Sequence, residues 1–152
     1  MGRFVLILIS HRGNINGKNE RYENNPDYIQ NAIDRGFHVE VDVWSFEDDG
    51  YWLGHDEPQY HVEENYLEDS KLWCHAKNIY ALNQMIENGK IHCFFHHEDD
   101  VTLTSQGYLW TYPGRDLTKN SIAVLPDGEV PEDIAGICSD FIEEYYEKNN
   151  IV

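Results

Sequence analysis

Apolar residues along this chain form short runs separated by polar turns, with two clear helical stretches in the first half. Residues 4–9 are continuously apolar, which is typical of a strand buried on both faces. A helix is predicted over residues 26–35, because Asn25 can cap it and Pro26 suits its first turn. The alternating residues 37–44 predict a second strand, and the order strand, helix, strand implies parallel pairing.

The rest of the chain predicts further strands with little room for helices between them. Asn78 can cap a second helix that places Leu82, Met85 and Ile86 on one face. Residues 59–69 are acidic and irregular, so we expect a loop there. Further strands are predicted at residues 51–53, 71–76, 91–95, 101–104, 108–112, 121–125 and 136–139, and a last short helix at 141–148.

The composition narrows the class of protein. A chain of 152 residues that is 41% hydrophobic and 13% aromatic predicts one globular domain over residues 1–152. The formal net charge of −17 argues against binding nucleic acid through phosphates and against docking on anionic lipid. A local cation or a metal would be needed to hold any phosphate group in so acidic a molecule.

Two further features bear on the compartment. Cys74, Cys93 and Cys138 form no CxxC pair and lie in apolar runs, so we expect buried free thiols. The apolar start passes straight into His11 with no small-residue cleavage site, and no run has transmembrane length. We therefore expect a cytoplasmic protein without stable membrane association.

Two carboxylates mark the second strand. Glu40 and Asp42 are two residues apart, so both side chains project from one face. An ordinary amphipathic strand at a surface also gives this pattern. A strand in a parallel sheet is covered on both faces, however, and covered carboxylates need a compensating cation. Paired carboxylates suit Mg²⁺ or Ca²⁺.

Two histidines stand at the ends of strands. His11 follows the first strand, at the end where α/β folds place their sites, although a hydrogen-bonded structural histidine is an alternative. Arg12 beside it favours phosphate binding, because its guanidinium offers a matching fork of donors. His55 precedes Asp56 after a predicted hairpin, and the alternative for it is a histidine on a surface loop.

The motifs in the first half of the chain, taken together, resemble those of the glycerophosphodiester phosphodiesterase family. They also resemble the wider superfamily of phosphatidylinositol-phospholipase-C-like phosphodiesterases, including the spider-venom-type phospholipase D branch. The order and spacing of the motifs carry the resemblance. They are HRG at residues 11–13, Glu23-Asn24, ExD at residues 40–42 and HD at residues 55–56.

The resemblance implies a TIM-type barrel that binds a divalent metal. It implies that His11 and His55 are the general acid and base. It further implies that Glu40 and Asp42 bind the metal and that Arg12 holds the phosphodiester.

The chain departs from the family pattern at the next strand. The family's ExK motif is matched by His75-Ala76-Lys77. The resemblance makes Lys77 a substrate-binding residue and puts His75 in the place of a metal-binding carboxylate. Mg²⁺ or Ca²⁺ remains the expected ion, while the imidazole also admits Mn²⁺ or Zn²⁺.

The chain is also short for the fold, which commonly needs ~250 residues. We therefore predict a small, pared-down TIM-type (β/α)₈ barrel with several helices missing. The missing helices would expose apolar surface, so we expect a homo-oligomer that covers it.

The expected function is a metal-dependent phosphodiesterase that hydrolyses a small glycerophosphodiester-like substrate by acid–base catalysis with two histidines. One alternative is a non-catalytic module that binds phosphate esters. Another is a phospholipase D-like enzyme that releases a cyclic phosphate.

Two stretches of the second half are left with two interpretations each. The HHEDD run at residues 96–100 fits a solvated acidic loop better than a part of the site. Trp110 and Tyr112 share a strand face, where they suit either an aromatic core or a pocket wall.

Overall fold

A computed structural model of the chain describes residues 5–150. Within them a single sheet of 10 strands is accompanied by three α-helices and one 3₁₀ helix. The strands are β1 (Ile7–His11), β2 (His38–Phe46), β3 (Gly50–Leu53), β4 (Tyr60–Val62), β5 (Leu72–Ala76), β6 (Cys93–Phe94), β7 (Val101–Leu103), β8 (Leu109–Thr111), β9 (Ser121–Val124) and β10 (Gly136–Ser139). The helices are α1 (Pro26–Asp34), η1 (Glu64–Glu68), α2 (Ile79–Asn88) and α3 (Ile142–Asn150). No helix in this part of the chain has both the length and the apolarity to cross a membrane.

The sheet is mixed, and the predicted (β/α)₈ barrel is wrong. Parallel pairing runs through the order β6-β5-β2-β1-β10-β9-β8. The strands β3 and β4 add to β2 in antiparallel fashion, and β7 pairs antiparallel with β8. An α-helix follows only β1, β5 and β10, so strands and helices do not alternate as that barrel requires.

The sheet does not close, because no strand ladder joins β6 to β7 in the described residues. Single hydrogen bonds cross this seam instead. The amide of Ser105 donates to the carbonyl of Cys93 at 2.8 Å, and the hydroxyl of Thr102 donates to the carbonyl of Phe95 at 2.9 Å. β6 is only two residues long, so it offers little edge for a regular ladder.

The helix boundaries follow the predicted caps. The Asn25 side chain accepts a hydrogen bond from the Asp27 amide at the start of α1, and Asn78 caps α2 in the same way. Gly89 ends α2 in the left-handed conformation at φ 76°. The apolar face predicted for α2 is only partly buried. Ile86 is 57% exposed, whereas Met85 is buried together with Ala81.

The predicted loop at residues 59–69 is also wrong. It contains β4 and η1, and it buries Val62 and Leu67. The acidic residues there point to solvent, while the backbone of β4 pairs with β3. Tertiary pairing therefore overrides a polar sequence.

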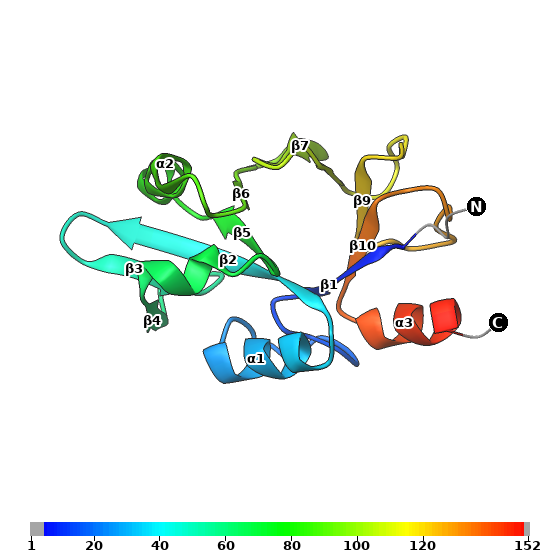
Figure 1. Cartoon of the computed structure of the whole chain (residues 1–152), viewed down its shortest axis with the longest axis horizontal. Coiled ribbons are helices and arrows are strands. Elements are labelled where there is room, and N and C mark those ends of the chain that lie inside the picture. The colour runs from blue at the N-terminus through cyan, green and yellow to red at the C-terminus, as the bar shows by residue number, and fades with distance from the viewer. Residues whose placement is uncertain (1–4, 151–152) are drawn as a thin grey trace.

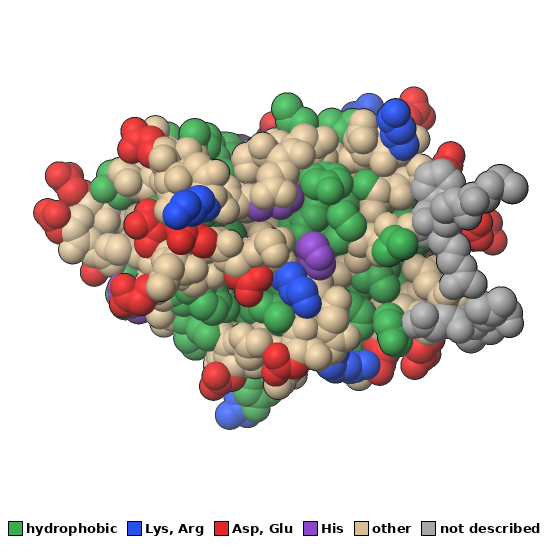
Figure 2. Space-filling view, in the orientation of Figure 1, with side chains coloured by type: hydrophobic (Ala, Val, Ile, Leu, Met, Phe, Trp, Pro, Cys, Tyr) green, Lys and Arg blue, Asp and Glu red, His purple; other side chains and the backbone are tan. Residues whose placement is uncertain are grey.

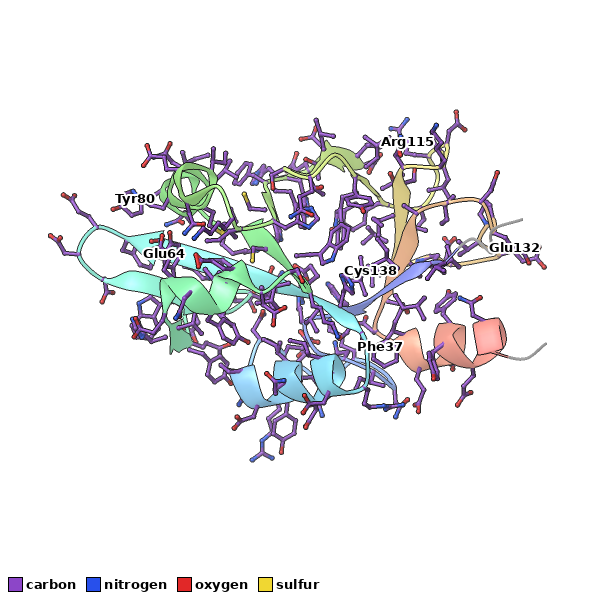
Figure 3. The ribbon with its side chains drawn as sticks, viewed as in Figure 1. Phe37, Glu64, Tyr80, Arg115, Glu132 and Cys138 are labelled. Carbon is purple, nitrogen blue, oxygen red and sulfur yellow. The ribbon has the colours of Figure 1, made fainter. Side chains whose placement is uncertain are left out.

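Hydrophobic side chains form one cluster on each face of the sheet. The outer cluster joins the sheet to all three α-helices and includes Phe37, whose ring meets Tyr146 of α3 edge-on with centroids 5.9 Å apart (Figure 3). The inner cluster contains no helix residue and includes Cys138 (Figure 3). Figure 1 shows the strands following a curved path with the helices outside it. The inner face is therefore a concave surface on which a site can be built.

Apolar surface remains uncovered near the seam. Ile79 and Ile86 of α2 and Val101 and Leu103 of β7 are all large and exposed. These residues give a homo-oligomer a surface to cover, and the oligomer itself remains a prediction.

The tight spacing of the central strands gives a test of the fold. A Cβ atom on Gly136 of β10 would overlap the carbonyl oxygen of Ile7 and crowd the side chain of Ile122. We expect Gly136→Ala to lower the free energy of unfolding by roughly 1–3 kcal/mol, measured by urea denaturation. The control Gly128→Ala meets nothing within 4 Å and should stay within about 0.5 kcal/mol of the wild type. If Gly136→Ala and Gly128→Ala changed the free energy of unfolding equally, the close approach of β1 and β10 at Gly136 would be contradicted.

Candidate functional site

The inner face of the sheet changes from apolar to polar toward the carboxyl ends of its strands. Because strand side chains alternate, the residue two positions after each inner apolar residue also faces inward. Ile9, Trp73, Phe94, Trp110 and Cys138 belong to the inner apolar cluster. The residues two positions later are His11, His75, His96, Tyr112 and Asp140. These side chains form a polar layer above the apolar one, with Glu40 and Asp42 from β2.

A cavity of about 250 Å³ opens over this polar layer. Figure 2 shows histidine side chains beside hydrophobic ones near the centre of the corresponding face. The residues that line the cavity are His11, Arg12, Glu40, His55, His75, Ala76, Lys77, Phe95, His96, His97, Trp110 and Tyr112.

Three buried side chains could hold a metal ion. Donor atoms of Glu40, Asp42 and His75 all lie within 4.8 Å of one another. The His75 Nδ1 lies 3.1 Å from an oxygen of Asp42. The Oε1 atom of Glu40 is shut off from solvent and has no hydrogen-bond partner. An orphaned buried carboxylate oxygen beside two other donors fits a cation-binding group.

The two carboxylates differ in charge state. Burial raises the pKa of Glu40, and the charge of Asp42 raises it further, to about 7. Burial also acts to raise the pKa of Asp42, but the hydrogen bond from His75 and the charge of Arg12 outweigh it. The pKa of Asp42 is therefore well below its ordinary range. Near neutral pH, Asp42 is therefore ionised, whereas Glu40 is divided between its protonated and its ionised form.

Arg12 lines the cavity, but its guanidinium is already engaged. Its Nη1 donates to Glu23 at 3.1 Å, and its Nε lies 3.0 Å from Asp42 as an ion pair without hydrogen-bond alignment. The backbone of Arg12 has φ 60°, an uncommon value for a residue with a side chain. Two of its three nitrogens therefore hold carboxylates of the protein.

Asn24 is the second fixed partner of Asp42. Its amide donates to an Asp42 oxygen at 2.9 Å, and its carbonyl accepts from the Asp42 backbone at 2.9 Å. Asn24 also has positive φ, at 66°. Such conformations persist where the surroundings hold them. The Glu23-Asn24 motif thus anchors Arg12 and Asp42.

His11 is held by a carboxylate that the sequence did not single out. Its Nδ1 lies 2.8 Å from Asp140, and its Nε2 lies 3.8 Å from Glu40. Asp140 also accepts a hydrogen bond of 2.9 Å from the buried amide of Asn14. Burial acts to lower the pKa of His11, but the Asp140 hydrogen bond and the Glu40 charge outweigh it, so the pKa is raised. Asp140 was identifiable in principle as the residue two positions after the inner-facing Cys138.

His55 and Lys77 reach the same cavity from other loops. The side chain of His55 is 42% exposed, and its Nδ1 lies 2.8 Å from Asp56. His11 and His55 thus open on one cavity, as an acid–base pair requires, while their roles remain a prediction. Lys77 lines the cavity too, and no carboxylate of the described residues lies within ion-pair distance of its amine.

His96 belongs to the cavity wall, contrary to the preferred interpretation of its run as a solvated loop. Its ring stacks on His75 with centroids 4.3 Å apart and an interplanar angle of 4°. Its Nε2 lies 3.1 Å from the hydroxyl of Tyr112. Burial lowers the pKa of His96 to about 4, with further lowering from His75. Trp110 fits both interpretations offered for it, since it is 2% exposed in the inner cluster and also lines the cavity.

Comparisons of the chain with protein-family models, with characterised proteins and with solved structures found no match. The case for a function therefore rests on the site itself.

The contact between His11 and Asp140 gives a test of this geometry. Asp140→Asn should lower the pKa of His11, measured by NMR titration of its ring, because a neutral amide stabilises imidazolium less than a carboxylate does. The raised pKa of His11 stabilises the fold at pH values below the ordinary histidine pKa, and this contribution is lost as the pH rises through the folded value. The variant should therefore lose more stability at about pH 5 than at about pH 9.

The control for this test is Asp116→Asn, which changes an exposed carboxylate on the loop after β8. It should leave the titration of His11 unchanged. If His11 titrates alike in the wild type and in Asp140→Asn, then Asp140 does not set the charge state of His11.

Proposed function

We propose that this chain is a metal-dependent phosphodiesterase that hydrolyses a small phosphodiester of the glycerophosphodiester type. The observation that carries the proposal is the buried group of Glu40, Asp42 and His75 at a cavity that His11 and His55 also line. The motif resemblance supports it. The open sheet differs from the barrel that the resemblance implies, so the fold does not support the proposal. The proposal depends on the arrangement of the side chains.

The donor set bears on the choice of metal. Two carboxylates suit Mg²⁺ or Ca²⁺, and one imidazole suits Mn²⁺ or Zn²⁺. When bound, a divalent ion supplies positive charge against the phosphate and lowers the pKa of an attacking hydroxyl. The protein's own part is to hold the donors in place, which Asn24 and Arg12 do for Asp42.

The two histidines divide the proton transfers. Asp140 favours the protonated form of His11, so His11 is the general acid and its Nε2 carries the proton for the leaving alcohol. His55 is the general base. Its Nδ1 is bonded to Asp56, which leaves Nε2 to accept the proton of the attacking hydroxyl. Lys77 contacts the phosphate as a free cation.

Two other functions fit the same site. If the attacking hydroxyl belongs to the substrate, the product is a cyclic phosphate, as in a phospholipase D-like enzyme. If productive metal binding is lost, the cavity is a phosphate-ester-binding module. The histidine at position 75, where the resembled family has a carboxylate, favours this module as the second candidate.

Metal binding is the first test. Isothermal titration calorimetry with Mg²⁺, Ca²⁺, Mn²⁺ and Zn²⁺ should find an ion whose binding disappears in Glu40→Gln and in Asp42→Asn. Affinity should fall as the pH drops below about 7, because Glu40 must lose its proton to bind the ion. The control Glu47→Gln, on the exposed hairpin turn, should bind like the wild type. Unchanged binding in Glu40→Gln would remove this group as the metal site.

Turnover is the second test, followed by ³¹P NMR on glycerophosphodiesters, lysophospholipids and sugar-phosphate diesters. His11→Ala and His55→Ala should each lower turnover by about two to four orders of magnitude. The double variant should lose less than the product of the single losses, because both groups act on one transition state. The control His61→Ala, an exposed histidine on β4, should retain activity.

The same experiment separates the three candidate functions. A cyclic phosphate signal as the final product would favour the phospholipase D-like reaction. Absence of turnover with every metal and substrate would reject the enzyme, and binding of phosphate esters without metal would then support the module.

A further inference from the structure

The hydroxyl of Tyr112 lies at the cavity wall and contacts His96. Tyr112 follows β8, lines the cavity and is half-buried. Its oxygen lies 3.1 Å from Nε2 of His96. This contact holds the hydroxyl in position at the cavity wall.

The environment of His96 decides which partner donates. The other ring nitrogen of His96, Nδ1, is shut off from solvent and has no hydrogen-bond partner. At least one ring nitrogen of an imidazole carries a proton. With the proton on Nδ1, an N–H would be buried without an acceptor, which is rarer in proteins than an unpaired acceptor. The proton therefore belongs on Nε2, which donates to the Tyr112 oxygen.

This assignment leaves the phenolic proton of Tyr112 free. With its proton on Nε2, that nitrogen of His96 is a donor and cannot accept the hydroxyl proton. Burial raises the pKa of Tyr112 to about 12, so the hydroxyl stays protonated at neutral pH. The free O–H is then a neutral donor available to a ligand in the cavity.

Such a donor would add to the few donors left in the cavity, because two of the three Arg12 nitrogens are engaged with Glu23 and Asp42. A phosphoryl group carries more acceptor oxygens than Lys77 alone can satisfy. We infer that the Tyr112 hydroxyl, oriented by His96, donates a hydrogen bond to a phosphoryl oxygen of the ligand in this cavity. The inference rests on the proposed function, since it deepens the binding of a phosphate ester at the same site.

The test measures binding and needs no turnover. Glycerol 3-phosphate is titrated into the metal-saturated protein by calorimetry. Tyr112→Phe should weaken its binding about tenfold, because it removes one hydrogen bond to a charged oxygen and leaves the ring in place. The control Tyr108→Phe removes the hydroxyl of another inner-face tyrosine that packs on Trp73 outside the cavity lining. It should bind within about twofold of the wild type.

A second measurement examines the tautomer directly. Long-range ¹H–¹⁵N NMR of the histidine rings should show the proton of His96 on Nε2. A proton on Nδ1 would overturn the assignment, because the Tyr112 hydroxyl would then donate to His96.

The outcomes separate this inference from the proposed function. If the wild type binds glycerol 3-phosphate and Tyr112→Phe binds equally well, the Tyr112 donor is rejected and the proposed function stands. If the wild type does not bind the probe with any metal, both are rejected together.

Discussion

The structure depends on burying two like charges two residues apart on one interior strand. Glu40 and Asp42 are 3% and 0% exposed, and like charges so placed cannot both ionise without compensation. Asp42 is compensated by Arg12 and Asn24 of the loop between β1 and α1 and by His75 of β5, whereas one oxygen of Glu40 has no hydrogen-bond partner. A buried carboxylate oxygen without a hydrogen bond lowers stability if the pair is only structural. A cation bound beside it would remove that cost.

Much of the site was predictable from the sequence because strand geometry is local. The alternation of β2 placed Glu40 and Asp42 on one face, and the same rule on β5 placed His75 with Lys77. The same alternation, counted from Phe94, also places His96 on the inner face. The charged run at residues 96–100 made a solvated loop the preferred interpretation instead. Asn25 and Asn78 mark helix starts for an equally local reason, since a cap acts within one turn.

The remainder depends on contacts between segments distant in the chain. The predicted barrel is wrong because helices do not alternate with the strands and because no ladder joins the two-residue strand β6 to β7, and no periodicity within either strand indicates that gap. β4 forms because β3 offers an edge to three residues, and the acidic stretch that follows concealed this strand. Asp140 meets His11 across 129 positions of sequence, a pairing that only the parallel neighbours β1 and β10 create.

Because the sheet is open between β6 and β7, one wall of the cavity is held by fewer backbone hydrogen bonds than the other. The wall built on β1, β2 and β5 is braced by continuous ladders and by the network around Asp42. The wall that carries His96 follows a two-residue strand and is tied across the seam by isolated hydrogen bonds. Local opening should therefore start there, so amides 96–100 should exchange with solvent long before those of β2. A ligand that contacts both walls would link them across the seam. Its binding would slow the hydrogen exchange of backbone amides at this edge of the sheet.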